Sequence, residues 1–296
     1  KHCKKGSKNF IFEASSHGLD QGRVEGLPIN IAAVTNISQD HLDYHRNMKF
    51  YRKAKFKILT NYLEEKGIAI VNSKIRIPKK IMKILYNKSI KLIRYGSDKS
   101  KIYIIKKNKK LFLSINNKKY NLNLILHNDY DISNFECAIC IALEMGIRKK
   151  YIIEKISNIS RPPGRMEKCN KMNNNSQVFV DFAHTPEALK NILISTNKSL
   201  GKKPNLVFGC GGNRDKSKRI VMGKIASLYS RNVYITDDNP RNENPKIIRL
   251  EILKGCPTAE VIGDRRKAIK TAISKLKKKE VLIVAGKGHE KYQFVK

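Results

Sequence analysis

Two polar motifs in the first part of the chain contain side chains that could bind a metal ion beside phosphate. In the first, Glu13–Gly18, a carboxylate directly follows an apolar run. The second, Thr35–His45, places His41 among acidic residues, and Lys55 follows it. Oxygen ligands at the ends of strands are typical of sites for divalent cations. Alone, a glutamate such as Glu13 is more often a helix cap or an ion-pair partner, and His41 could equally be a cap in a polar turn.

The second half of the chain carries motifs that suit a carboxylate ligand. In Asp238–Arg241 a guanidinium stands on a turn stiffened by proline, where it can hold a carboxylate through two parallel hydrogen bonds. The loop Gly209–Lys216 is rich in glycine and basic residues, which alone is weak evidence for phosphate binding. The alternative for Arg241 is a solvated surface charge, and Arg165 could merely pair with Glu167. Other polar motifs are Gly164–Glu167, Asp181–Pro186 and Gly286–Glu290.

The first half of the chain predicts a mixture of short strands and helices. Several short β-type runs are separated by turns rich in Lys and Asn, and residues 106–119 predict a hairpin. The expected strands are 9–14, 29–36, 68–71, 102–105 and 111–113, and the expected helices are 48–62, 132–145 and 149–158.

A break near residue 160 divides the chain. Two prolines and a glycine in Arg161–Gly164 end a helix and stiffen the connection, so we expect domains of residues 1–160 and 161–296. The later residues alternate between β and helical patterns, which predicts a largely parallel sheet with helices on both faces. Ligands gather at the carboxyl ends of such strands. Strands are expected near 177–182, 204–209, 232–236, 259–262 and 280–285, with Asp181, Gly209, Asp237 and Gly286 at their ends.

Composition limits the classes of function. The 296 residues suffice for two domains with real cores, and no apolar stretch reaches the ~18 residues of a membrane span. The net charge of +36 raises the alternative of a nucleic-acid-binding protein, but the basic residues are mostly Lys and are spread along the chain. The six cysteines form no framework, and Cys137 and Cys140 are interpreted as core residues rather than metal ligands. We expect reduced thiols and a cytoplasmic location.

Together, and in this order from Phe12 to Gln293, the motifs resemble the ATP-dependent Mur ligases, and among them the members that add the third amino acid to the peptidoglycan precursor. The resemblance implies an α/β fold: a partial Mur ligase central domain with a mixed sheet and helices, then a Rossmann-like C-terminal domain with a mainly parallel sheet. The family's phosphate loop, Gly-x-Gly-Lys-Thr-Thr, does not occur in the chain. We therefore expect a piece that lacks the N-terminal domain and this loop, stops before the last strand and helix, and is inactive alone.

The resemblance also implies roles for individual residues. Lys55 would be an N6-carboxylysine, because a carbamate replaces a cation with an anion able to hold magnesium beside phosphate. Lys55, His41 and Arg165 would be catalytic. Asp131 departs from the family, which has an asparagine there to read adenine, and an ionised Asp cannot donate a hydrogen bond. The implied ligands are Glu13, His41 and Lys55 for the metal; Asn134, Arg165, Asp181 and His184 for ATP; Ser15, Gln21 and Arg23 for the UDP-MurNAc-dipeptide, with Thr35 and Asn36 closing that pocket; and Arg214, Asp238, Asn239, Pro240, Arg241, Gly286 and Glu290 for diaminopimelate.

The reaction that the resemblance implies is amide formation in peptidoglycan biosynthesis. The γ-carboxylate of UDP-MurNAc-L-Ala-D-Glu attacks the γ-phosphate of ATP with Mg²⁺ present, and the amine of meso-2,6-diaminopimelate then displaces phosphate from the acyl phosphate. Arg241 favours diaminopimelate because that amino acid carries a second carboxylate, which lysine lacks. We expect a monomer whose domains close about residue 160. A lysine-adding or folate-glutamate-adding ligase of the same fold is the alternative.

Overall fold

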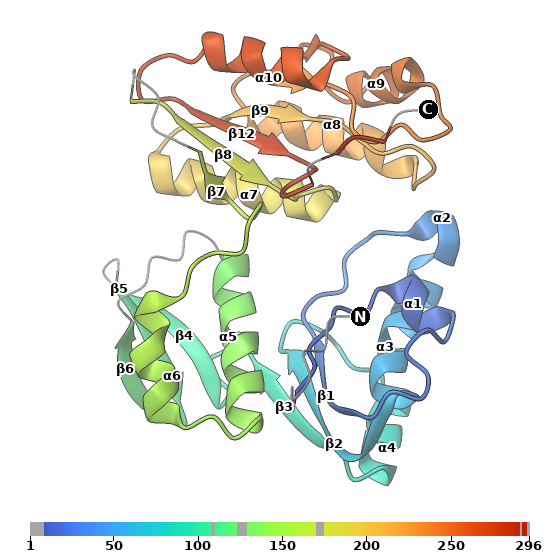
Figure 1. Ribbon diagram of the computed structural model, residues 1–296, viewed down its shortest axis with the longest axis vertical. Coiled ribbons are helices and arrows are strands. Elements are labelled where there is room, and N and C mark those ends of the chain that lie inside the picture. The colour runs from blue at the N-terminus through green and yellow to red at the C-terminus, as the bar shows by residue number, and fades with distance from the viewer. Residues whose placement is uncertain (1–8, 108–109, 123–128, 170–174, 291, 295–296) are drawn as a thin grey trace.

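The computed structural model describes residues 9–107, 110–122, 129–169, 175–290 and 292–294. Its helices and strands form two lobes, each built on a six-stranded sheet (Figure 1). The described residues from 9 to 158 form the N-terminal lobe, those from 167 to 294 form the C-terminal lobe, and residues 159–166 join them. Cys3, expected to be a reduced thiol, lies outside the described residues. None of the described helices is both long and apolar enough to cross a membrane.

The sheet of the N-terminal lobe is parallel on one side and antiparallel on the other. Its order is β1-β2-β3-β4-β5-β6, with parallel neighbours from β1 to β4 and antiparallel neighbours from β4 to β6. Asn116 and Asn117 have φ angles of 47° and 64°, which a tight hairpin turn requires and asparagine tolerates. The expected hairpin is confirmed and is extended by a third strand. The strands are β1 (Ile29–Val34), β2 (Leu63–Asn72), β3 (Lys91–Tyr95), β4 (Ile102–Lys107), β5 (Lys110–Ile115) and β6 (Lys118–Leu122).

Helices cover both faces of this sheet because successive side chains of a strand point to opposite sides. Ala69 and Val71 of β2 belong to the core beneath α1, α3 and α4, whereas Ile70 belongs to the core beneath α5 and α6. The helices are α1 (Ser16–Asp20), α2 (Leu42–His45), α3 (Met48–Thr60), α4 (Lys79–Asn87), α5 (Asp129–Glu144) and α6 (Lys149–Lys155), followed by a 3-10 turn (Ile156–Asn158).

The expected strand at 9–14 is wrong. Residues 9–15 have no regular secondary structure. A strand needs a neighbour to pair its backbone groups, and this segment pairs with neither of the two sheets formed by the described residues. Phe12 and Ala14 still pack against the core beneath α1 and α3. The sequence also did not predict α4 and β3, whose apolar patterns are interrupted by lysines and by Arg94.

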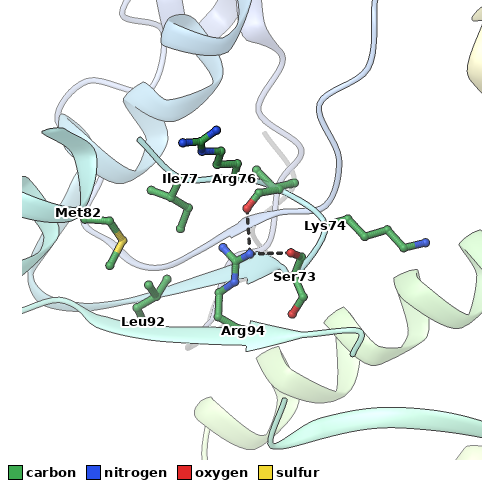
Figure 2. A pocket seen from close by; sticks show the side chains of 8 residues that line it. Ser73, Lys74, Arg76, Ile77, Met82, Leu92 and Arg94 are labelled. Atoms are coloured by element: carbon green, nitrogen blue, oxygen red, sulfur yellow. Dashed lines mark hydrogen bonds between the residues drawn. The ribbon is translucent and has the colours of Figure 1, made fainter. Parts of the chain in front are cut away.

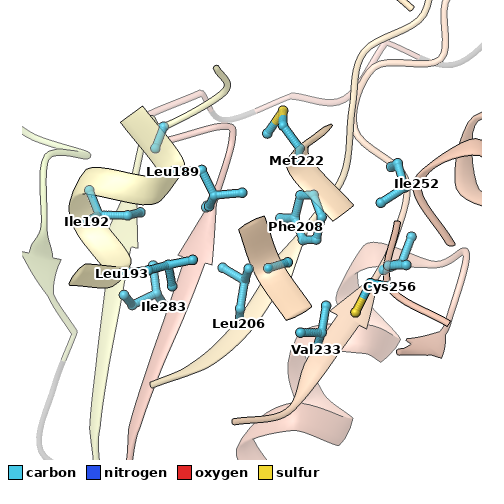
Figure 3. Close-up of a cluster of buried hydrophobic side chains, with 14 of the residues drawn as sticks. Leu189, Ile192, Leu193, Leu206, Phe208, Met222, Val233, Ile252, Cys256 and Ile283 are labelled. Carbon is cyan, nitrogen blue, oxygen red and sulfur yellow. The ribbon is translucent and has the colours of Figure 1, made fainter. Parts of the chain in front are cut away.

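The C-terminal lobe has a mainly parallel sheet, so the expected fold class is confirmed. The order is β11-β10-β9-β12-β8-β7, and only β7 runs antiparallel to its neighbour. Leu206 and Phe208 of β9 pack with α7, α8 and α9 (Figure 3), whereas Val207 packs with α10 on the other face. The strands are β7 (Glu167–Lys168), β8 (Gln177–Asp181), β9 (Asn205–Phe208), β10 (Val233–Ile235), β11 (Glu260–Val261) and β12 (Val281–Ala285), and the helices are α7 (Pro186–Leu200), α8 (Ser217–Tyr229), α9 (Pro245–Leu253) and α10 (Arg265–Ser274).

The connection between the lobes is anchored at both ends. Arg161 donates from Nη2 to Oδ2 of Asp131 on α5 at 2.6 Å. The backbone N–H of Met166 donates to Oδ2 of Asp181 in the C-terminal lobe at 2.8 Å. Tyr130 of α5 packs against the core of the C-terminal lobe. The domain boundary expected near residue 160 falls in this connection and stays a prediction.

Candidate functional site

Ser15 caps the first helix. Its Oγ accepts a hydrogen bond from the backbone N–H of Gly18 at 3.1 Å, which orients the start of α1. Gln21 ends the same helix, and Arg23 is exposed. The capping interpretation of Ser15 is therefore correct, and the dipeptide-binding role of the three residues stays a prediction.

His41 has an unusual backbone and an unpaired ring nitrogen. It precedes α2 with φ 56°, in the left-handed region that is costly for residues other than glycine, and its side chain makes no capping hydrogen bond. Its Nδ1 is buried and has no hydrogen-bond partner among the described residues. Burial lowers the pKa of His41, against the opposing effect of Asp40. A neutral imidazole with a free nitrogen fits a metal ligand.

His41 lies beside a cluster of aromatic rings that was not expected from the sequence. The ring of His17 lies 4.7 Å from that of His41 and 4.3 Å from that of Tyr44, measured between centroids. His45 is buried, with Nε2 3.0 Å from Ser16 Oγ. His17 and His45 both fall inside the motifs noted above, which was the available signal for them.

Lys55 lies on α3, where its side chain is partly removed from solvent. Its side chain is half-buried, and burial lowers its pKa, while the nearby carboxylates of Asp40 and Glu13 raise it. The uncharged amine is the form that can react with carbon dioxide. No group of three His, Cys, Asp or Glu residues in the described ranges could by itself hold a metal ion. A metal site formed by Glu13, His41 and a carbamate on Lys55 stays a prediction.

At the end of β8, Asp181 supports the connection between the lobes. Its two oxygens accept backbone hydrogen bonds from Met166 and Ala183, each at 2.8 Å. Burial raises its pKa, and these two hydrogen bonds oppose the effect. Both oxygens are thus used within the chain, and the role expected for Asp181 toward ATP stays a prediction.

Arg165 is exposed beside this strand end and does not form the pair considered from the sequence. Its guanidinium lies 4.8 Å from the centre of the Phe182 ring. The carboxylate of Glu167 instead accepts from the backbone N–H of Gly164 at 2.6 Å. The guanidinium of Arg165 is therefore held by a ring face and faces solvent.

Asp131 forms an ion pair with a residue of the connection between the lobes. It pairs with Arg161 in the connection, as described above, so its side chain ties α5 to that segment. Asn134, one turn later on α5, is exposed. The loss of adenine readout at Asp131 stays a prediction.

In the C-terminal lobe, two glycines allow the Asp238–Arg241 turn to lie on the Gly-rich loop. A Cβ at Gly212 would lie 1.9 Å from the carbonyl oxygen of Pro240, and one at Gly211 would lie 2.8 Å from Nη1 of Arg241. Arg241 has φ 52° and donates from Nη1 to the carbonyl of Gly212 at 2.8 Å. Burial lowers its pKa, and the neighbouring charge of Arg214 adds to the effect. Two guanidinium groups close together are typical of a site for an anion.

A buried lysine, Lys287, connects Asn239 of the Asp238–Arg241 turn to Glu290. Lys287 donates from Nζ to Oδ1 of Asn239 at 2.9 Å and to Oε2 of Glu290 at 2.8 Å. Asn239 also donates from Nδ2 to Oε2 of Glu290, at 3.2 Å. Glu290 keeps Oε1 without a hydrogen bond among the described residues, and its pKa is lowered by Lys287 against the effect of desolvation. Lys287 was not expected to be a site residue from the sequence, although it lies within the Gly286–Glu290 motif.

Gly286 completes this strand-end group. Its φ of 110° is accessible to glycine, and a Cβ there would lie 3.0 Å from Oδ2 of Asp238. Its backbone N–H donates to the carbonyl of Asp181 at 3.1 Å. The structure thus brings together the ends of β8, β10 and β12.

The two lobes meet at Asp40. Its Oδ1 lies 3.6 Å from Nζ of Lys218, and its Oδ2 lies 3.6 Å from Nε2 of His184. Desolvation raises the pKa of Asp40, but contacts with His184, Lys218 and His41 outweigh it and hold the pKa well below its usual range. The loop that carries His41 therefore touches the lobe that carries Arg241. That Lys55 and Arg241 face each other across one cleft stays a prediction.

A separate pocket of about 540 Å³ opens in the N-terminal lobe (Figure 2). Arg94 crosses it and donates from Nη2 to the carbonyls of Ser73 and Ile75, at 2.8 Å each. None of the predicted site residues lines this pocket. The predicted site is thus distinct from it.

Comparison with known proteins places this geometry in a family. The Mur ligase middle domain matches residues 1–142, and the Mur ligase glutamate ligase domain matches residues 164–288. A UDP-N-acetylmuramoyl-L-alanyl-D-glutamate--2,6-diaminopimelate ligase of Rickettsia montanensis is 41% identical over 301 residues, covering 99% of this chain and 62% of that protein. The chain therefore spans less than two thirds of that relative's length.

Solved structures of ligases are also similar to this chain. A UDP-N-acetylmuramoyl-L-alanyl-D-glutamate--2,6-diaminopimelate ligase is 30% identical with a TM-score of 0.57, covering 95% of this chain and 59% of its own. A bifunctional folylpolyglutamate synthase/dihydrofolate synthase from Yersinia pestis, complexed with AMPPNP and a Mn ion, is 17% identical with a TM-score of 0.66, covering 87% of this chain and 58% of its own, and shows the shared fold. With both of the family's domains matched in order along the two lobes, the chain belongs to the Mur ligase family.

Proposed function

We propose that the chain is the catalytic and amino-acid-binding part of an ATP-dependent, ADP-forming ligase that joins meso-2,6-diaminopimelate to UDP-MurNAc-L-Ala-D-Glu. The proposal includes a cytoplasmic, monomeric enzyme of peptidoglycan biosynthesis. The observation that carries it is the charge arrangement of the C-terminal lobe. The charges of Arg214 and Glu290 both act on Arg241, and Glu290 keeps Oε1 without a hydrogen bond among the described residues. This suits an amino acid with two carboxylates and an ammonium group. The 41% identical relative from Rickettsia montanensis supports the same substrate.

On the N-terminal lobe, the chain's own groups would hold the metal. Glu13, His41 and a carbamate on Lys55 would bind Mg²⁺, and the buried, unpaired Nδ1 of His41 supports this assignment. ATP and Mg²⁺ would together supply the phosphoryl group and neutralise its charge. The Yersinia pestis structure with AMPPNP and Mn supports the use of this cofactor pair within the fold.

The remaining assigned residues would position the reactants. Ser15, Gln21 and Arg23 would contact the dipeptide precursor, and Asn134, Asp181 and His184 the nucleotide. Arg165 would reach the transferred phosphate, because its guanidinium is exposed beside the connection between the lobes. Asp238, Asn239, Pro240 and Gly286 would shape the turn that presents Arg241.

Amino-acid binding tests the proposal on this chain directly. Calorimetric titration should show that meso-diaminopimelate binds more tightly than L-lysine. Arg241→Met should remove that difference. The affinity for diaminopimelate should fall by about tenfold, because a charge-assisted contact to its second carboxylate is lost. Arg231→Met is a matched control, because Arg231 pairs with Glu280 at 2.8 Å away from these residues. Equal binding of the two amino acids by the unmodified chain would favour a lysine-adding ligase.

A further inference from the structure

Asp40 is a buried carboxylate held by the opposite lobe. Its exposed fraction is 9%, and that of Lys218, its cationic neighbour on α8, is 5%. The ion pair with Asp40 is the only polar contact of the Lys218 ammonium within the described residues. Burying two such groups is costly unless they neutralise each other. Their burial therefore depends on the two lobes lying together.

A second contact lies beside this pair. Gln39, the residue before Asp40, directs Nε2 toward Oδ2 of Asp215 and Oγ of Ser217, each at 3.4 Å. Asp215 in turn accepts from the backbone N–H of Ser217 at 2.9 Å. Two consecutive residues of the N-terminal lobe thus meet the segment 215–218 of the C-terminal lobe.

The start of α8, which carries Lys218, is held in place by hydrogen bonds of the adjacent residue. The next residue, Arg219, is fully buried and donates to Glu243 through both terminal nitrogens at 3.0 Å, and to Glu251 at 2.7 Å. It also donates to the carbonyl of Gly211 at 3.3 Å. Glu243 accepts from the backbone N–H of Asn213 at 2.6 Å. The helix start and the Gly-rich loop therefore form one unit, which also carries Arg214.

On the other side, Asp40 is coupled to His41. Its Oδ1 accepts from the backbone N–H of His41 at 2.9 Å. A displacement of the Asp40 carboxylate would therefore change the backbone that presents the imidazole.

We propose that Lys218 is a positioning residue. Together with His184, it holds Asp40 and thereby sets the distance between the loop of His41 and the loop of Arg214. The catalytic consequence, alignment of the metal side with the amino-acid side, rests on the proposed function. The contact between the lobes does not.

Two measurements on the full chain test the contact. The first is the rate of lysine acetylation at low reagent concentration, followed by mass spectrometry. Lys218 should react slowly in the unmodified chain and about tenfold faster in Asp40→Ala, because its buried charged partner is lost. Lys216, two residues away, is the internal control: its side chain is 65% exposed and should react readily in both proteins.

The second measurement is the radius of gyration by small-angle X-ray scattering. Lys218→Met keeps the side-chain length but leaves Asp40 without its cation, so the lobes should separate and the radius should increase. Lys218→Arg keeps the charge and should restore the compact form. Lys216→Met should resemble the unmodified chain, because Lys216 contacts Glu243 within its own lobe, at 3.5 Å.

Either of two results would overturn the proposal: Lys218 reacting as fast as Lys216 in the unmodified chain, or Lys218→Met scattering like the unmodified chain. If Lys218→Met does not fold, Asp40→Ala tests the same contact from the other lobe. Neither measurement uses substrate. A chain that fails to bind meso-diaminopimelate would refute the proposed function and leave this test intact.

Discussion

Lys55 and Lys57 lie two residues apart on α3 but have different surroundings. Lys57 donates to Oδ1 of Asp20 at 2.6 Å, which keeps its ammonium paired. Lys55 has no such hydrogen bond to another described residue; its ammonium lies 5.6 Å from the centre of the Tyr51 ring, and burial lowers its pKa. Burial also raises the pKa of Tyr51, to about 12, so this phenol stays neutral beside the amine. The difference between the two lysines is thus one of environment, not of residue type.

The proposed carbamate on Lys55 can be tested directly. In ¹³C-bicarbonate at pH 8, the chain should show a carbamate carbon signal that disappears in Lys55→Arg, because only an uncharged amine adds carbon dioxide. Lys57→Arg should keep the signal, since Lys57 is paired with Asp20. A signal unchanged in Lys55→Arg would place any carbamate elsewhere.

Glu136 predicts a pH dependence of stability. It is 3% exposed, Oε1 accepts from the backbone N–H of Ile104 at 2.7 Å, and burial raises its pKa to about 7. The unfolded carboxyl ionises from about pH 4.5, whereas the folded one stays protonated until about pH 7. Stability should therefore fall as pH rises between these values, by roughly 3 kcal/mol.

Glu136→Gln should flatten this pH dependence, because an amide cannot ionise while its Oε1 can still accept from Ile104. Thermal unfolding at intervals from pH 4.5 to 8 measures how the unfolding temperature changes with pH. This change with pH is compared between the two proteins, not the unfolding temperature at any single pH. A variant that keeps the full slope of the unmodified chain would assign the effect to another group.

At the scale of elements, α8 holds the Gly-rich loop through Arg219. The guanidinium is fully buried, and its hydrogen bonds lower the pKa of Glu243 to about 2. Arg219→Met would leave Glu243 and Glu251 without their shared cation. The variant should lose roughly 3–5 kcal/mol of unfolding free energy, as expected when one partner of a buried pair is removed.

Urea unfolding measures this loss, with Lys216→Met as the control. Lys216 also faces Glu243, but from an exposed position, so its removal should cost less than about 1 kcal/mol. Similar losses in the two variants would show that burial of Arg219 does not decide the stability of the loop.

At the scale of the whole molecule, the charge is distributed over both lobes. Exposed lysines occur on α4, α6 and α10, for example Lys79, Lys149 and Lys270, on elements that belong to different lobes and sheets. A charge spread in this way produces general attraction to polyanions rather than one aligned binding face.

Binding of a fluorescent DNA duplex should therefore be measurable at ~20 mM salt and lost at ~150 mM, because sequence-independent contacts release counterions and weaken steeply with salt. Fluorescence anisotropy measures it. Tight binding that persists at the higher salt would revive the nucleic-acid alternative.

The sequence alone predicted the parallel sheet of the C-terminal lobe and the strand ends that carry Asp181, Asp237 and Gly286, whereas the domain boundary expected near residue 160 stays a prediction. These features follow from local patterns: the alternation of apolar runs with helical periodicity, and prolines that cannot continue a helix. For the same reason the local pattern failed at residues 9–14, because an apolar run becomes a strand only when a neighbour supplies hydrogen bonds.

Tertiary structure alone decided which charged groups pair. Asp40 with Lys218, Arg219 with Glu251, and Asp131 with Arg161 each join residues that lie far apart in the sequence. Pairing depends on distance and burial, and both are set by how loops from different strands and lobes pack. Residue types along the chain therefore determined which chemistry was available, and folding determined where each charge found its partner.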